Sequence, residues 1–198
     1  MRERMLTVMG SGKTRLMGLA SRFGKDRRGV GAVEFAIIFP ILVALYLTSF
    51  ELTLAYSAFK RASHATASIN DLISKKNSVD KAYLQTTPVV TQAIFAPHNA
   101  NGLKLKISGI KIDDKTQAKI AWSWSWDGTE GKPYTAGSSV TVPKGLLIAS
   151  TFLVHVELSV DHNLLMFMPN LSSDVQKIPI GREYYFKQRD QEITCSDC

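Results

Sequence analysis

The sequence has few of the residues that several structural classes require. Its 198 residues include only two cysteines, so a framework of disulfides cannot hold the fold together. There is no internal repeat and no low-complexity linker. With 45% hydrophobic and 21% charged residues, the composition is that of a folded protein and excludes a disordered or fibrous chain. We expect one ordinary domain with additional segments.

Net positive charge is scarce outside the N-terminus, although the whole chain has a formal net charge of +7. Residues 1–29 hold eight Lys or Arg residues against two acidic ones, whereas the remaining residues hold 16 against 15. A protein that binds nucleic acid should carry its basic face on the folded body. We therefore expect no nucleic-acid partner and interpret residues 1–29 as a basic leader.

Signatures of nucleotide and metal binding are incomplete. Residues 10–14, GSGKT, resemble the end of a phosphate-binding loop, but Thr7 stands where that pattern needs glycine. The histidines at positions 64, 98 and 162 lack the spacing of metal ligands. We predict neither a cofactor nor a metal site.

Catalytic groups do not come close enough for chemistry. His155, Glu157, Ser159 and Asp161 share one face of a predicted strand. At about 3.3 Å per residue, His155 and Ser159 stand roughly 13 Å apart, too far for a hydrogen-bonded nucleophile and base. We interpret this face as solvated and predict that the protein is not an enzyme.

A long apolar run follows the basic leader. Phe35–Phe50 carries no charge, and apolar residues resume after Glu51 up to Tyr56. These 22 residues make roughly 33 Å of helix, enough to span a hydrocarbon core of about 30 Å. A buried core helix would not explain the cations before the run, and a cleaved secretory signal would need a small-x-small site after it. The sequence predicts a transmembrane helix with its N-terminus in the cytoplasm and the rest exported.

The helical pattern continues beyond the membrane segment. Small and apolar residues recur at spacings of three and four, which predicts one helix from about residue 31 to 74. The apolar stripe consists of Ala55, Ala58, Ala62, Ala65, Ile69 and Leu72. The opposite, polar face is expected to carry Lys60, Ser63, Thr66 and Asn70. Ser78 and Asp80 indicate the start of a short helix, which Pro88 interrupts or ends before residues 89–95.

After Gly102 the period changes to two, as in half-buried antiparallel strands. The predicted strands are 103–108, 120–126, 140–142, 152–160 and 184–187. We therefore predict an α+β fold with a long N-terminal transmembrane, pilin-like helix, a short helix and an antiparallel meander of four or five strands. The expected segments are a cytoplasmic leader (1–29), a transmembrane helix (30–56) and an exported α+β domain (57–198).

Two further features are candidate sites. Trp122, Trp124 and Trp126 lie on one face of a predicted strand together with Ile120, where three indoles can fill a core or form a contact face for a sugar or a partner protein. Cys195 and Cys198 are expected to pair with each other in an oxidising periplasm, where so short a loop adds little stability.

The junction between leader and apolar run, KDRRGVGAVEF, resembles the processing site of type IV prepilins. In that superfamily a basic leader ends in glycine and a glutamate occupies the fifth mature position. Cleavage after Gly29 makes Val30 the first mature residue and Glu34 the fifth, whereas cleavage after Gly31 would put an alanine there.

The string GAVEFAIIFPIL is similar to the TadE-like pseudopilins of Tad (Flp) pilus systems. Pro40 stands six residues after Glu34, and Glu51 lies near the far end of the apolar run. The arginine-rich stretch expected after Glu51 is reduced to Lys60 and Arg61, which leaves TadE-, TadF- and TadG-like members as alternatives.

This resemblance implies a single-pass inner-membrane pseudopilin, or minor pilin, that takes part in assembly of a Tad/Flp-type pilus for adhesion. The implied partners are a prepilin peptidase, other pilins and assembly proteins of the inner membrane, and the lipid bilayer. Glu34, Phe35, Pro40 and Glu51 are the implied residues of assembly and helix packing. The alternative is a membrane-anchored periplasmic binding or adhesive module that uses the tryptophan face.

Overall fold

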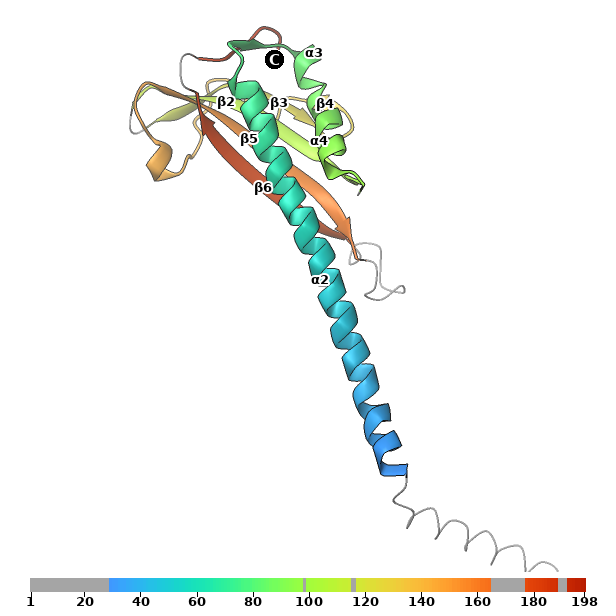
Figure 1. Cartoon of the computed structure of the whole chain (residues 1–198). Coiled ribbons are helices and arrows are strands. Elements are labelled where there is room, and N and C mark those ends of the chain that lie inside the picture. Colours follow the sequence, from blue (N-terminus) through green and yellow to red (C-terminus); the bar gives the residue numbers. More distant parts are fainter. Residues whose placement is uncertain (1–28, 98, 115–116, 165–176, 189–191) are drawn as a thin grey trace, which may run out of the picture. The chain divides into compact units, whose positions relative to one another are not determined.

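The computed structural model describes residues 29–97, 99–114, 117–164, 177–188 and 192–198 of the chain (Figure 1). The predicted leader up to residue 28, with its GSGKT string, and His98 lie outside the described residues. The chain divides into two compact units, one up to Ser49 and one from Phe50 to Cys198.

One helix, α2, runs through Val30–Ser74. Its bounds agree with the predicted helix to within a residue. Pro40 lies inside this helix, where proline removes one backbone hydrogen bond, yet the helix continues on both sides of it. The first unit, as far as it is described, consists of the beginning of α2, and the rest of α2 belongs to the second unit.

The second unit contains a five-stranded antiparallel sheet in the order β4-β3-β2-β5-β6. The strands are β2 (Lys104–Ile112), β3 (Ala118–Trp126), β4 (Glu130–Gly131), β5 (Thr151–Asn163) and β6 (Lys177–Lys187). The predicted α+β class and strand number are confirmed. The predicted meander is wrong in one respect, because β5 returns to pair with β2 and not with β4. This leaves the long strand β6 at one edge of the sheet.

The main core lies between the sheet and the helices. Buried residues of α2 pack there at spacings of three and four, namely Ala58, Ala62, Ala65, Ile69 and Ile73. Ile73 takes the place predicted for Leu72, which is 39% exposed. Thr66 and Asn70, predicted on the polar face, are also buried. Asn70 Nδ2 donates to the carbonyl oxygens of Val154 (3.3 Å) and Tyr184 (2.9 Å), so this amide joins α2 to β5 and β6.

A bulge between Gly109 and Ile110 changes which residues of β2 and β3 face the helices. Beyond it Ile120 no longer shares a face with the tryptophans but joins a second, smaller apolar cluster. Gly109 is required at the bulge, because a Cβ there would lie 2.5 Å from Trp122 Nε1 and 2.6 Å from Phe152 Cζ. The missing side chain of Gly109 therefore allows the rings of Trp122 and Phe152 to lie directly over the backbone of β2.

The short helices begin at a capping aspartate and at a proline. Asp80 caps α3 (Lys81–Leu84) by accepting a hydrogen bond from the backbone N–H of Tyr83 at 2.7 Å. Pro88 neither interrupts nor ends a helix; it lies in the first turn of α4 (Thr87–Phe95), where a missing N–H costs nothing.

Two short stretches differ from the prediction. Residues 140–142 form no strand; an isolated bridge between Lys119 and Ser139 and a hydrogen bond from Val140 to Ala118 take its place. Strands β1 (Ser78–Val79) and β7 (Thr194–Cys195), which were not predicted, pair in parallel and attach the C-terminal segment beside α3.

Candidate functional site

The N-terminal part of α2 exposes its apolar side chains all round. The most apolar 18-residue window of the helix has a mean hydropathy of 2.3, and none of it is buried. The two hydroxyl groups near its end are satisfied within the helix, since Thr48 Oγ1 donates to the carbonyl of Ala44 (2.8 Å) and Ser49 Oγ to that of Leu45 (2.9 Å). A helix that is apolar on every side needs an apolar surrounding, and this one is long and apolar enough to cross a membrane.

The predicted processing residues lie at the start of this helix. Val30 is the first residue of α2, and Gly29 directly precedes it with open space around its Cα. Glu34 lies about one turn further along and is exposed. With no side chain and open space around it, the backbone at Gly29 is accessible, and the first turn of α2 places Glu34 about one turn from Val30.

The other predicted assembly residues have different surroundings. Phe35 is 61% exposed, and its ring centroid lies 5.4 Å from that of Phe39. Glu51, in contrast, is only 5% exposed and belongs to the folded second unit. The surroundings of Glu51 are those of a side chain within the fold, whereas Glu34, Phe35 and Pro40 are exposed.

The tryptophan side chains pack in the main hydrophobic core. Trp122 and Trp124 are 6% and 1% exposed, and Trp126 is half-buried against the same core. Both buried indoles use their N–H groups, Trp122 Nε1 donating to the carbonyl of Ile193 (2.7 Å) and Trp124 Nε1 to Glu130 (3.2 Å). Of the two interpretations of this face, the structure supports core filling, because indoles buried in this way offer no surface to a sugar or a partner.

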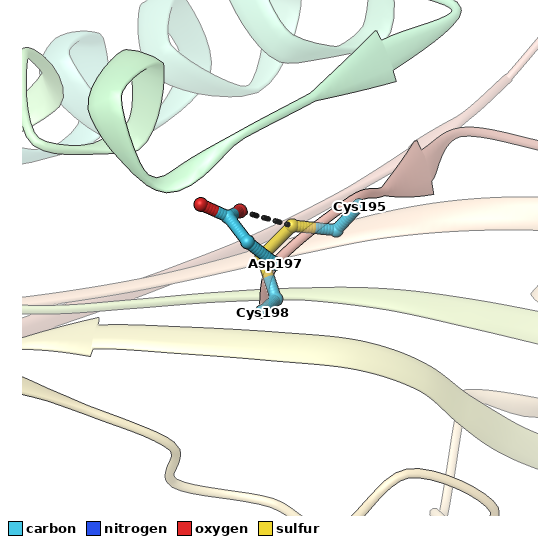
Figure 2. A group of neighbouring side chains, drawn as sticks. All are labelled: Cys195, Asp197 and Cys198. Atoms are coloured by element: carbon cyan, nitrogen blue, oxygen red, sulfur yellow. Dashed lines mark hydrogen bonds between the residues drawn. A yellow bond between two sulfur atoms is a disulfide. The ribbon is translucent and has the colours of Figure 1, made fainter.

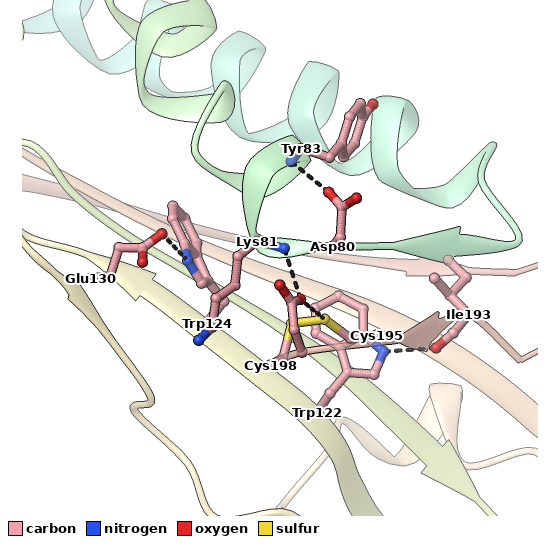
Figure 3. The surroundings of a disulfide bond; sticks show 10 residues. Asp80, Lys81, Tyr83, Trp122, Trp124, Glu130, Ile193, Cys195 and Cys198 are labelled. Carbon is pink, nitrogen blue, oxygen red and sulfur yellow. Dashed lines mark hydrogen bonds between the residues drawn. A yellow bond between two sulfur atoms is a disulfide. The ribbon is translucent and has the colours of Figure 1, made fainter.

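The C-terminal segment is fastened beside these indoles (Figure 3). Cys195 and Cys198 form a disulfide, and Asp197 accepts a hydrogen bond from the backbone N–H of Lys81 at 2.9 Å, at the start of α3. The sulfur atoms and a carboxylate oxygen of Asp197 lie within 4.8 Å of one another (Figure 2). Zinc binds thiolates, and in a disulfide neither sulfur is a thiolate. With the disulfide formed, Cys195, Asp197 and Cys198 attach the C-terminal segment to the start of α3 and do not form a metal site.

A polar cluster on the other face of the sheet corrects the prediction of a solvated strand. His155 is 6% exposed; its Nε2 lies 3.3 Å from Glu183 Oε2, and its ring stacks on Tyr185 with centroids 4.0 Å apart. Glu157 lies 3.3 Å from Lys106 Nζ and accepts a hydrogen bond from the Tyr134 hydroxyl. Ser159 takes no part in the hydrogen bonds that link these groups.

The protonation states of this cluster follow from burial. Burial lowers the pKa of His155 below its usual 6.5, against the opposing effect of Glu157 and Glu183. Burial and the hydrogen bond to Glu157 raise the pKa of Tyr134 to about 12. At neutral pH the cluster therefore holds a neutral imidazole and a protonated phenol. Sequence reasoning missed it because Glu183, Tyr134 and His155 come from distant segments.

Comparison with known protein families gives a match at the start of the described chain. Residues 29–68 match the family described as TadE-like protein. These residues are similar to TadE-like proteins, and we call them the TadE-like segment. It begins at Gly29, includes Glu34 and Glu51, and ends inside α2, so the sheet and the short helices lie outside it. The TadE-like segment and the exposed apolar helix together fit a membrane protein related to Tad pili. No curated protein and no solved structure matches the chain.

Proposed function

We propose that the protein is a single-pass inner-membrane pseudopilin that functions in assembly of a Tad (Flp) pilus used in adhesion. The observation that carries the proposal is the TadE-like segment on an apolar helix with no buried residue in its most apolar window. The protein acts by assembling with other pilins and pilus assembly proteins, and it catalyses no reaction itself.

The proposed orientation has the N-terminus in the cytoplasm and the second unit in the periplasm. It is supported by the eight basic residues among residues 1–29, against two acidic ones. A reporter enzyme that is active only in the periplasm, fused after Cys198, should be active. Activity of a cytoplasmic reporter at the same position would overturn the orientation.

Maturation is proposed to follow insertion. A prepilin peptidase cuts between Gly29 and Val30, which removes the basic leader and creates an α-amine on Val30. This amine, with a pKa of about 7.7–8.0, is largely charged at neutral pH. Cleavage therefore replaces a bulky basic leader by a single cation close to Glu34.

Glu34 is the proposed assembly contact. A charged side chain at the centre of a bilayer costs about 2.5–3.5 kcal/mol on insertion scales, and an unpaired Glu34 at its edge bears part of this cost, so a role in pairing is expected. The new amine of Val30 provides that partner, either in the same chain, one helical turn away, or in a neighbouring subunit. A pair between subunits fixes the axial register of adjacent helices, which apolar packing alone leaves loose.

The test is the variant Glu34→Gln, which keeps the size and polarity of the side chain and removes its charge. We expect this variant to be inserted and cleaved but not to crosslink to other pilins or support a pilus. Glu192→Gln is the matched control, because Glu192 is exposed, lies outside α2 and pairs with the exposed Lys111, so its charge should not affect assembly. Normal piliation and crosslinking in Glu34→Gln would leave Glu34 as an interfacial residue without a role in assembly.

The alternative of an adhesive module that uses the tryptophan face has no support from the geometry. Trp122 and Trp124 are buried. We therefore develop the pseudopilin proposal alone.

A further inference from the structure

A group of exposed aromatic and basic side chains lies where α2 passes β6. We call it the interfacial patch and define it as Tyr56, Phe59 and Lys60 of α2 with Ile178 and Arg182 of β6. Its large apolar members are unusually open, with Tyr56 57%, Phe59 40% and Ile178 47% exposed. Exposed rings gathered on one surface of a folded unit indicate a contact with something else.

The two elements of the patch are held together by contacts between rings and cations. The guanidinium carbon of Arg182 lies 3.3 Å from the ring centroid of Phe59. The rings of Tyr56 and Phe59 are stacked with centroids 6.4 Å apart, and Lys60 Nζ lies 5.1 Å from the Tyr56 centroid. Ile178 and Arg182 lie four residues apart on β6, so they share the face of the strand that meets α2.

The charge of the patch is of one sign. Among the residues that the structure describes, Lys60 and Arg182 contact aromatic rings and form no ion pair with a carboxylate. Other basic side chains of this unit do have acidic partners, for example Lys111, which lies 2.9 Å from Glu192. Two cations held in place on rings, with no carboxylate partner in the described part of the chain, suit an anionic ligand.

The sequence places the patch directly after the apolar run. The 20 residues Phe35–Leu54 make about 30 Å of helix and fill a hydrocarbon core. Tyr56, Phe59 and Lys60 then come roughly 3–9 Å further along the helix, in the headgroup layer, which is about 5–8 Å thick. Tyrosine and long basic side chains are typical of this layer.

The start of β6 lies at the same level of α2. Leu54 and Ala58 line one hollow together with Asn163, and Asn163 is paired with Lys177, the first residue of β6. Ile178 and Lys177 are thus close to the turn of the helix that precedes Phe59. Both elements of the patch therefore face the region where headgroups are expected.

We propose that the interfacial patch binds anionic phospholipid headgroups and holds β6 against the membrane surface that α2 crosses. The inference rests on the membrane insertion proposed above. Lys60 and Arg182 contact the lipid phosphates, while the rings and Ile178 lie at the boundary between headgroups and acyl chains. A second copy of the chain fits the surface poorly, because two such patches would bring like charges together.

The test is hydrogen exchange of the full chain reconstituted into nanodiscs, one protein per disc. One preparation contains phosphatidylcholine alone and the other contains phosphatidylcholine with phosphatidylglycerol. We expect the amides of β6, Lys177–Lys187, to exchange several-fold more slowly in the anionic discs, and this difference to shrink in high salt. The amides of β3, which is distant from β6 in the sheet, should exchange equally in both.

The double variant Lys60→Gln, Arg182→Gln should abolish the lipid-dependent difference. The matched control is Lys132→Gln, Lys144→Gln, which removes the same charge from exposed positions outside the patch and should retain the difference. Equal exchange of β6 in the two lipids, or the same difference in both double variants, would overturn the proposal. If the exchange of the β6 amides slows only in discs that hold two proteins, and does so without anionic lipid, a second copy of the chain covers the patch. That result would also overturn the proposal.

The same preparations separate this inference from the proposed function. Entry of the chain into nanodiscs tests anchoring by α2 and does not depend on the patch. A chain that enters the discs but shows no lipid dependence of β6 refutes the patch alone. A chain that does not enter them refutes anchoring, and the patch proposal with it.

Discussion

Removal of the Asn70 side chain tests how α2 is fixed to the sheet. The amide is fully buried and donates to the carbonyl oxygens of Val154 and Tyr184. Each such hydrogen bond contributes about 0.5–1.5 kcal/mol, and a buried carbonyl left without a partner costs about 1–3 kcal/mol. Asn70 Oδ1 has no hydrogen-bond partner among the described residues, so its removal recovers part of this cost. We expect Asn70→Ala to lower the free energy of unfolding by about 2 kcal/mol.

The assay is urea unfolding of the full chain in mild detergent, followed by the fluorescence of the buried Trp122 and Trp124. A loss of this size should also lower Tm by about 4–8 °C for a chain of this length. Ser63→Ala is the matched control, because the Ser63 hydroxyl bonds only to the Phe59 carbonyl within α2, and the expected change is below about 0.5 kcal/mol. A change of equally small size in Asn70→Ala would refute the reasoning that this amide ties the helix to β5 and β6.

Three further predictions concern the sheet and the leader. Because burial lowers the pKa of His155 below 6.5, the unfolded chain binds a proton there more readily, and the stability of the fold should decrease as the pH drops below about 6.5. The urea midpoint of His155→Gln should lack this part of the pH dependence. Identical pH profiles of the urea midpoint in the variant and the unmodified protein would contradict the prediction. Gly109→Ala should destabilise the fold by about 1–3 kcal/mol in the same urea assay, because the new Cβ meets Trp122, and an unchanged midpoint would show that the bulge can adjust. Gly29→Phe should remain as the longer precursor on immunoblots while the control Gly31→Ala is processed normally; normal processing of both would move the cleavage site elsewhere.

Much of the fold follows from short-range patterns in the sequence. The spacing of Ala58, Ala62, Ala65 and Ile69 indicates one face of a helix, and the alternation along β5 indicates a strand with one face in the core. Both patterns depend only on residues within a few positions of each other. The uncharged run from Phe35 likewise predicts the exposed part of α2, and this prediction needs no knowledge of any other element.

The features that the sequence did not predict depend on distant partners. Asn70 looks like a surface residue until β5 and β6 supply two carbonyls, and the neutral state of His155 depends on its burial in the fold, against the opposing effect of Glu183. The bulge at Gly109 reverses the face of Ile120, since a slip of one residue moves every later side chain to the other side. Pairing between segments far apart in the chain decides each of these outcomes, and local periodicity carries no information about it.

The central claim is that the TadE-like segment anchors the protein in the membrane as a processed pseudopilin. The most direct test is mass spectrometry of the membrane-associated protein from cells with and without a prepilin peptidase. We predict a chain that begins at Val30 when the peptidase is present and a chain that retains the 29-residue leader when it is absent. The same N-terminus in both kinds of cell, or a protein recovered in the soluble fraction, would contradict the account.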